Sequence, residues 1–227
     1  MSQLITMKRL VFITIAVFVV AVSAFFIVEN LMSPDVEGVT YAEAPDSEGQ
    51  PLKGDPSAPV VITEFGDYKC PSCKGWDESI MPQLDSDYIQ PGEVQIIYIN
   101  TLFHGEESGL AALASESVWE NHPDAFWEFH SKLFQEQPQV QSHDEPWVTP
   151  EAMIDVAHAM DADIDLEVLA TDMLEQTYID LVHKDMELVE NYEVTQTPTI
   201  MVGNVKLDNP FDYEQLKLAI EQQLEEN

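Results

Sequence analysis

The two cysteines of this chain stand together, directly after a segment with the pattern of a buried strand. Residues 59–65 form a short apolar run rich in β-branched side chains, and residues 66–69 then turn the chain. From Cys70 onward the apolar residues recur at helical spacing. Two cysteines separated by two residues cannot join distant parts of a fold, and they fall short of the four ligands of a usual zinc site. The sequence therefore predicts a strand, a turn and a helix that begins at Cys70, with Cys73 inside its first turn.

A cysteine at the start of a helix has a specific chemistry. The free amides and the positive end of the helix dipole favour thiolate over thiol at Cys70, and the thiolate is the attacking species in disulfide exchange. Cys73 lies close enough in sequence to close a small disulfide ring with it. Pro71 suits the first helical turn, where its missing N–H costs little. A structural disulfide and half of a zinc site are the alternative interpretations of this pair.

The remaining pattern predicts an α/β protein. Residues 94–100 indicate a second strand, and the spacing is helical from about residue 105 to residue 192. Residues 199–207 indicate a β-hairpin in which Gly203–Asn204 suits a two-residue turn. Residues 211–224 predict a terminal amphipathic helix. The predicted order is β, α, β, a helical block, β, β, α.

An uncharged apolar segment, residues 10–28, is long enough to span a bilayer. Because Lys8 and Arg9 precede it, the positive-inside rule predicts that residues 1–29 are a cytoplasmic tip and transmembrane anchor and that the rest is exported. A cleaved signal peptide is the competing interpretation. Residues 30–53 are rich in Pro, Gly, Ser and acidic residues and predict an extracytoplasmic spacer, which leaves residues 54–227 as the folded domain.

The chain is strongly acidic, with 42 acidic and 9 basic residues and a formal net charge of −33. Such a surface repels nucleic acid and anionic lipid, so no nucleic-acid partner is expected. The acidic residues are spread along the chain after the apolar segment. This spread favours adaptation to salty or alkaline surroundings over an acidic patch for a basic partner.

Four motifs together resemble the DsbA family of the thioredoxin superfamily, and most closely its membrane-anchored BdbD-type oxidases of Gram-positive bacteria. They are EFGDYKCPSCK (residues 64–74), FHG (103–105), LAALASE (110–116) and TPT (197–199). The resemblance covers the chain from about residue 49 to its C-terminus. It implies a thioredoxin fold, with a central mixed sheet flanked by helices and a helical domain inserted at about residues 105–192.

The resemblance also implies roles for individual residues. Cys70 would be the exposed nucleophile and Cys73 the buried resolving thiol, while Thr197 would precede a cis-proline, Pro198, that faces the active site. DsbA proteins of Gram-negative bacteria carry Pro-His between the cysteines, whereas this chain carries Pro71 and Ser72. Because the imidazole is missing, we expect a Cys70 pKa between the ~3.5 of DsbA and the ~7 of thioredoxin.

Glu64 lies before Cys70 in the middle of the apolar run. A carboxylate there would be buried beneath the helix that begins at Cys70, where desolvation would raise its pKa. The family resemblance implies that it relays protons to the resolving thiol. A Glu that points to solvent from an edge strand is the alternative.

Some BdbD-type proteins bind a calcium ion away from the cysteines. The corresponding positions here are Gln50, Glu116 and Asp185, whose oxygen-bearing side chains suit calcium. The calcium would be structural, because the resemblance implies that catalysis itself requires no cofactor.

Together these features predict a thiol–disulfide oxidoreductase that donates a disulfide to reduced exported proteins. A DsbB-like, quinone-linked membrane oxidase would reoxidise it. The enzyme would be held in the cell membrane by its single N-terminal helix, with the catalytic domain on the extracytoplasmic side. A disulfide reductase or isomerase using the same cysteines is one alternative, and a non-catalytic anchored binding module with a structural disulfide is another.

Overall fold

The computed structural model describes residues 12–23, 35–138 and 146–226. The chain divides into two compact units, Met1–Asp35 and Val36–Asn227. In the first unit, residues 12–23 form a helix. No helix within the described ranges is both long and apolar enough to cross a bilayer. The span predicted over residues 10–28 extends beyond the described residues at both ends.

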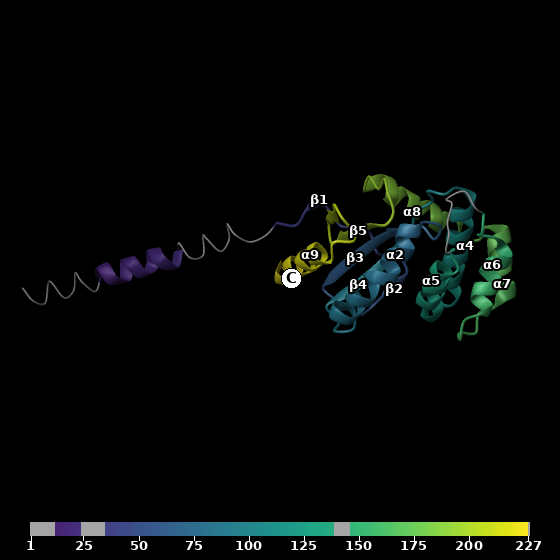
Figure 1. Ribbon diagram of the computed structural model, residues 1–227, viewed down its shortest axis with the longest axis horizontal. Coiled ribbons are helices and arrows are strands. Elements are labelled where there is room, and N and C mark those ends of the chain that lie inside the picture. The colour runs from purple at the N-terminus through teal and green to yellow at the C-terminus, as the bar shows by residue number, and fades with distance from the viewer. Residues whose placement is uncertain (1–11, 24–34, 139–145, 227) are drawn as a thin grey trace, which may run out of the picture. The chain divides into compact units, whose positions relative to one another are not determined.

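The second unit is built around one six-stranded mixed sheet (Figure 1). Its strands are β1 (Gly38–Thr40), β2 (Leu52–Lys53), β3 (Val60–Gly66), β4 (Val94–Asn100), β5 (Thr199–Val202) and β6 (Val205–Leu207). The order across the sheet is β1-β6-β5-β3-β4-β2. β3 pairs parallel with β4 and antiparallel with β5, so the strand that leads to Cys70 is central in the sheet.

Helices pack on both faces of this sheet and also form a block of their own. They are α2 (Pro71–Ser79), α3 (Met81–Leu84), α4 (Glu106–Asn121), α5 (Phe126–Gln135), α6 (Pro150–His158), α7 (Leu166–Glu175), α8 (Ile179–Asn191) and α9 (Tyr213–Glu226). Helices α4 to α8 lie between β4 and β5 in the chain, and α4, α5, α6 and α7 stand side by side in Figure 1. From β3 onward the elements follow the order predicted from the sequence.

The structure differs from the spacer expected over residues 30–53. Strands β1 and β2 both come from this segment, and they pair with β6 and β4. Gln50 is also buried in the second unit. The two strands are three and two residues long, which is too short for a periodic pattern to show in the sequence.

Strand β3 explains how a carboxylate comes to lie under helix α2. Alternate residues of a strand face opposite sides of the sheet. Ile62 belongs to the hydrophobic cluster that contains Trp76 of α2, whereas Phe65 belongs to the cluster on the other face with Leu188 of α8. Glu64 alternates in phase with Ile62, so it faces α2.

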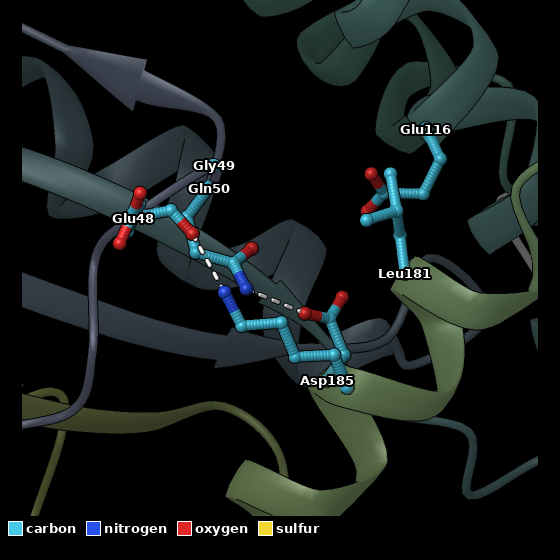
Figure 2. Close-up of a pocket in the computed structure, with 7 residues that line it drawn as sticks. Glu48, Gly49, Gln50, Glu116, Leu181 and Asp185 are labelled. Carbon is cyan, nitrogen blue, oxygen red and sulfur yellow. Dashed lines mark hydrogen bonds between the residues drawn. The ribbon is translucent and has the colours of Figure 1, made fainter.

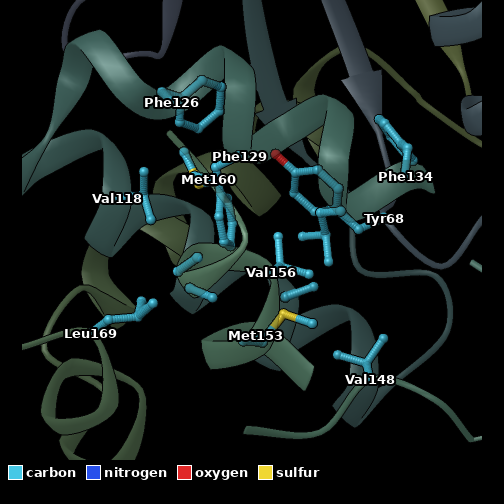
Figure 3. Packing of buried hydrophobic residues seen from close by; sticks show 14 of the residues in the cluster. Tyr68, Val118, Phe126, Phe129, Phe134, Val148, Met153, Val156, Met160 and Leu169 are labelled. Atoms are coloured by element: carbon cyan, nitrogen blue, oxygen red, sulfur yellow. The ribbon is translucent and has the colours of Figure 1, made fainter. Parts of the chain in front are cut away.

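A third hydrophobic cluster fills the helical block (Figure 3). Phe126 and Phe129 of α5 pack there with Met153 of α6, and all three side chains are fully buried. The same cluster includes Cys70 and Cys73. The core of the helical block is therefore continuous with the surroundings of the cysteine pair.

Candidate active site

Cys70 lies at the N-terminus of helix α2. It caps the helix with an extended backbone (φ −79°, ψ 120°), and Pro71 occupies the first turn. The N–H of Cys70 donates to the carbonyl oxygen of Asp67 at 2.9 Å, which closes the turn that follows β3. The predicted unit of strand, turn and helix is therefore present, and both cysteines are free thiols.

The surroundings of Cys70 lower the pKa of its thiol from 9.0 to about 5. The largest contribution is the hydrogen bond with the thiol of Cys73. The Thr197 side chain and the backbone amides of Cys73 and Ser72 also lower the pKa, while partial burial opposes them. Cys70 is therefore a thiolate at neutral pH, and its pKa lies inside the range expected from the sequence.

Cys73 has the opposite character. Its side chain is fully buried, and burial is the main reason why its pKa is raised well above 9.0. The hydrogen bond with Cys70 and the charge of Glu64 raise it further. The backbone N–H of Asp67 donates to the Cys73 sulfur at 3.4 Å. At neutral pH the pair therefore holds one sulfur as thiolate and the other as thiol.

The expectation that Cys70 is exposed is wrong. Only 7% of the residue is accessible, and its sulfur lies 3.3 Å from the carbonyl oxygen of Thr197. The Thr197–Pro198 peptide bond is cis, and Pro198 is buried. Ser72 is exposed beside it in the first turn of α2. An attacking sulfur therefore has only a small area through which to reach Cys70.

Glu64 is an interior residue of a central strand, and the edge-strand alternative does not hold. Neither of its carboxylate oxygens has a hydrogen-bond partner within the described part of the chain. Burial raises the pKa of Glu64 well above 4.5, and the negative charge of Asp77 raises it further. The charge of Glu64 acts in turn on Cys73. Electrostatic coupling therefore links Glu64 to the buried sulfur and to Asp77.

Asp77 and His130 continue this buried polar cluster under α2. Oδ1 of Asp77 lies 3.6 Å from Nε2 of His130. Burial lowers the pKa of His130, so its ring is neutral, and Nδ1 lies 3.1 Å from the hydroxyl oxygen of Tyr68. Neither residue was predicted from the sequence. Only Asp77 has a local signal, because it lies four residues after Cys73 and thus on the same face of the helix.

Comparisons with known proteins agree with this geometry. Residues 46–222 match the protein-family model described as Thioredoxin. Disulfide bond formation protein D of Bacillus subtilis (strain 168) is 42% identical over 180 residues, which is 79% of this chain and 79% of that protein. The probable disulfide bond formation protein D of Bacillus cereus is 30% identical over 215 residues, covering 95% of this chain and 94% of the relative.

This chain belongs to the DsbA family of thioredoxin-like thiol–disulfide oxidoreductases. The crystal structure of oxidised BdbD from Bacillus subtilis matches it with a TM-score of 0.77 and 41% sequence identity. The match covers 83% of this chain and 99% of that structure. The thioredoxin fold expected from the four motifs is thereby confirmed.

A second polar site of this DsbA-family chain brings together the three positions at which calcium was expected. Gln50, Glu116 and Asp185 line one pocket, together with Glu48 and Leu181 (Figure 2). Nε2 of Gln50 donates to Oδ1 of Asp185 at 2.8 Å. No group of three or more His, Cys, Asp and Glu side chains suited to a metal occurs in the described ranges. The pocket is lined by two buried carboxylates, the exposed Glu48 and one amide side chain.

Asn100, which was not predicted from the sequence, binds the two buried carboxylates of this pocket. Its side-chain amide donates to Oε1 of Glu116 at 2.7 Å and to Oδ2 of Asp185 at 3.0 Å. Burial raises the pKa of Asp185 to about 6. Burial together with the charge of Asp185 raises the pKa of Glu116 to about 9. Two buried acids that share one pocket in this way are a site at which a bound cation would relieve their repulsion.

Proposed function

We propose that this protein is an extracytoplasmic disulfide oxidase that donates the Cys70–Cys73 disulfide to reduced exported proteins. The observation that carries the proposal is the contrast between the two sulfurs, because the pKa of Cys70 is lowered to about 5 and that of Cys73 is raised. A sulfur that is stable as an anion leaves readily in disulfide exchange. A stabilised thiolate also stabilises the reduced pair, which favours transfer of the disulfide to another protein.

The proposed reaction has two exchange steps. A substrate thiolate attacks the sulfur of Cys70 and breaks its bond to Cys73, which gives a mixed disulfide at Cys70 and a thiolate at Cys73. A second substrate thiolate attacks the substrate sulfur of this mixed disulfide, forms the substrate disulfide and releases Cys70 as a thiolate. Two electrons thereby pass from the substrate to the cysteine pair.

Glu64 is the proposed proton donor to Cys73 in the first step. Because burial raises its pKa, it keeps a proton at pH values where an exposed Glu has lost it. Once it has released that proton, its negative charge raises the pKa of Cys73, which favours the thiol there. Thr197 and Pro198 are the proposed contacts for the incoming substrate, since the Thr197 carbonyl oxygen lies 3.3 Å from the Cys70 sulfur.

A DsbB-like, quinone-linked membrane oxidase is the proposed reoxidant. The relative named disulfide bond formation protein D favours the oxidising direction over the reducing one. Residues 10–28, with Lys8 and Arg9 before them, support a membrane anchor that keeps the enzyme near such a partner.

The reduction potential of the cysteine pair tests the direction of the reaction. The full-length protein would be equilibrated with glutathione buffers, and the fraction of free Cys70 and Cys73 would be measured by alkylation. We expect a reduction potential nearer to the value of about −120 mV that is typical of DsbA than to the value of about −270 mV that is typical of thioredoxin. A value at the thioredoxin end would favour the reductase alternative.

The variant Glu64→Gln is expected to slow formation of the mixed disulfide by roughly 10²-fold at neutral pH, because an amide cannot protonate the departing Cys73. Stability should change as well. The folded-state pKa of Glu64 is raised above 4.5, so the native protein binds more protons than the unfolded chain between the two values and loses stability as pH rises there. The free energy of unfolding of Glu64→Gln should therefore fall less with pH in denaturant titrations.

The control for this prediction is Glu151→Gln, which alters an exposed carboxylate in the first turn of α6. It should leave both the exchange rate and the pH dependence of stability unchanged. If Glu64→Gln exchanges at the rate of the unaltered protein, proton supply to Cys73 does not pass through Glu64.

We further propose that Gln50, Glu116 and Asp185 bind a structural calcium ion. The two buried carboxylates and their mutual repulsion suit a divalent cation, and the Gln50 amide and the adjacent backbone supply neutral oxygens of the kind that calcium accepts. Lys184 lines the same pocket, but its ammonium donates to the carbonyl oxygen of Glu48 at 2.7 Å. The ion would supply positive charge between the two acids and no step of the exchange reaction.

Calcium chloride is expected to raise the free energy of unfolding by about 2.7 kcal/mol at a concentration of 100 times the dissociation constant. The variant Glu116→Gln should lose this increase, and titration calorimetry should show loss of calcium binding. Glu106→Gln is the matched control and should keep the increase, because Glu106 is exposed in the first turn of the same helix, away from Glu116.

Magnesium chloride at the same ionic strength separates a specific site from general screening of the acidic chain. Magnesium demands a tighter octahedral shell and gives up its waters reluctantly, so it should stabilise the protein less than calcium. Equal stabilisation by both salts, or by sodium chloride, would contradict the calcium site.

A further inference from the structure

The side chain of Gln137 contacts the backbone at two points, one within the turn that leads into Cys70 and one at Cys70 itself. Its Nε2 donates to the carbonyl oxygen of Tyr68 at 2.7 Å and to that of Cys70 at 3.1 Å. The residue is 2% exposed, so these hydrogen bonds lie in the interior. Gln137 follows helix α5 of the helical block and is far from the cysteines in sequence.

Lys74 of α2 makes the reciprocal contact. Its ammonium donates to the carbonyl oxygens of Gln135, the last residue of α5, and of Gln137, at 3.3 and 3.4 Å. The start of α2 and the end of α5 therefore hold each other through side chain to backbone bonds in both directions.

We propose that Gln137 is a positioning residue that holds the first turn of α2 so that the backbone amides of Ser72 and Cys73 face the Cys70 sulfur. The carbonyl of Cys70 belongs to the capping residue of this turn, and it also accepts a bond from the N–H of Lys74 at 3.3 Å. Fixing that carbonyl fixes the peptide plane that follows Cys70. The inference rests on the proposed function, because it matters for exchange only if Cys70 is the attacked sulfur.

Loss of the Gln137 amide has a predictable direction. The thiolate of Cys70 is stabilised by amides whose orientation depends on a well-ordered first turn. The amide of Gln137 also offsets the negative ends of the Tyr68 and Cys70 carbonyl dipoles. Without it, the first turn is less ordered and the two carbonyl oxygens lose a donor, so the thiol form gains relative to the thiolate.

The test is a pH titration of thiolate ultraviolet absorbance in the reduced full-length protein carrying Gln137→Leu. We expect the pKa of Cys70 to rise by about 0.5 to 1 unit, which corresponds to a hydrogen bond of ordinary net strength. The equilibrium constant for oxidising glutathione should then fall by about 3- to 10-fold at neutral pH, because the reduced pair loses that much stabilisation.

Gln95→Leu is the matched control. Gln95 is also a buried glutamine, 7% exposed, and its Nε2 donates to the carbonyl oxygens of Ala58 and Pro56 at 3.0 and 3.3 Å. This bridge lies before the N-terminal end of β3, whereas Cys70 follows the C-terminal end. Gln95→Leu should cost similar stability and leave the pKa of Cys70 unchanged.

A purely structural role for Gln137 would lower stability without moving the titration, and that result would overturn the inference. An equal rise of the Cys70 pKa in Gln95→Leu would overturn it as well. If Gln137→Leu does not fold, Gln137→Asn decides, because its shorter amide cannot span both carbonyls and should give a smaller shift in the same direction. If Cys70 of the unaltered protein has the ordinary pKa of ~8.5, the proposed function fails as well. If its pKa is low and Gln137→Leu leaves it low, only the positioning role of Gln137 is refuted.

Discussion

The variant Cys70→Ser is expected to lower the rate of disulfide transfer by at least about 10³-fold, because a serine hydroxyl can neither hold nor pass on a disulfide. Oxidative refolding of a reduced protein substrate measures this rate. Circular dichroism should show that the variant keeps its fold, since the substitution removes one sulfur from the start of α2 and no core side chain of large volume.

Two companion variants sharpen this result. Ser72→Ala should transfer disulfides at close to the normal rate, because Ser72 is exposed and acts on Cys70 through its backbone amide. Cys73→Ser cannot form the internal disulfide, so it should also fail to refold a reduced substrate. With a disulfide-bonded substrate its Cys70 thiolate should form a mixed disulfide that accumulates, since the internal thiol that could displace the substrate is gone. Normal refolding activity in Cys70→Ser would show that the cysteine pair is only structural.

The variant Trp76→Ala is expected to lower the free energy of unfolding by about 3–5 kcal/mol, the usual range for removing a buried aromatic side chain. Trp76 is fully buried on the inner face of α2, and its Nε1 donates to the carbonyl oxygen of Pro210 at 2.9 Å. The lost side chain leaves a cavity between helix α2 and the sheet. Urea unfolding, followed by circular dichroism, measures the change.

Trp119→Ala is the matched control for this cavity. Trp119 also donates from Nε1 to a backbone carbonyl, that of Gly49 at 2.9 Å, but it is only partly buried. Its removal should cost about 1–2 kcal/mol, because water can fill much of the space. Equal costs for the two variants would mean that α2 is not held to the sheet mainly by Trp76.

The sequence was informative where structure follows from local pattern. The apolar run before Cys70, the second strand at residues 94–100 and the hairpin around Gly203 each lie where the periodicity placed them. Glu64 was expected to be buried because it stands in the middle of an apolar run, and its burial is confirmed. The alternation of side chains in β3 places it on the same face as Ile62.

Other features depend on contacts between distant residues and could not be read from the sequence. Gln137 reaches Cys70 from the end of α5, and Asn100 joins two acids that lie on different helices. Neither residue has a local pattern that marks it. The covering of Cys70 was missed for the same reason, since the carbonyl oxygen beside it comes from Thr197, 127 residues later in the chain.

The two edge strands of the sheet bear on the proposed encounter with reduced, unfolded substrates. A long unpaired strand at a margin offers a row of N–H and C=O groups to which any extended polypeptide can add. Here the outermost strands are β1 with three residues and β2 with two, so little of that template is available. In the proposed function, a substrate protein would then be oxidised and released without being captured as an extra strand.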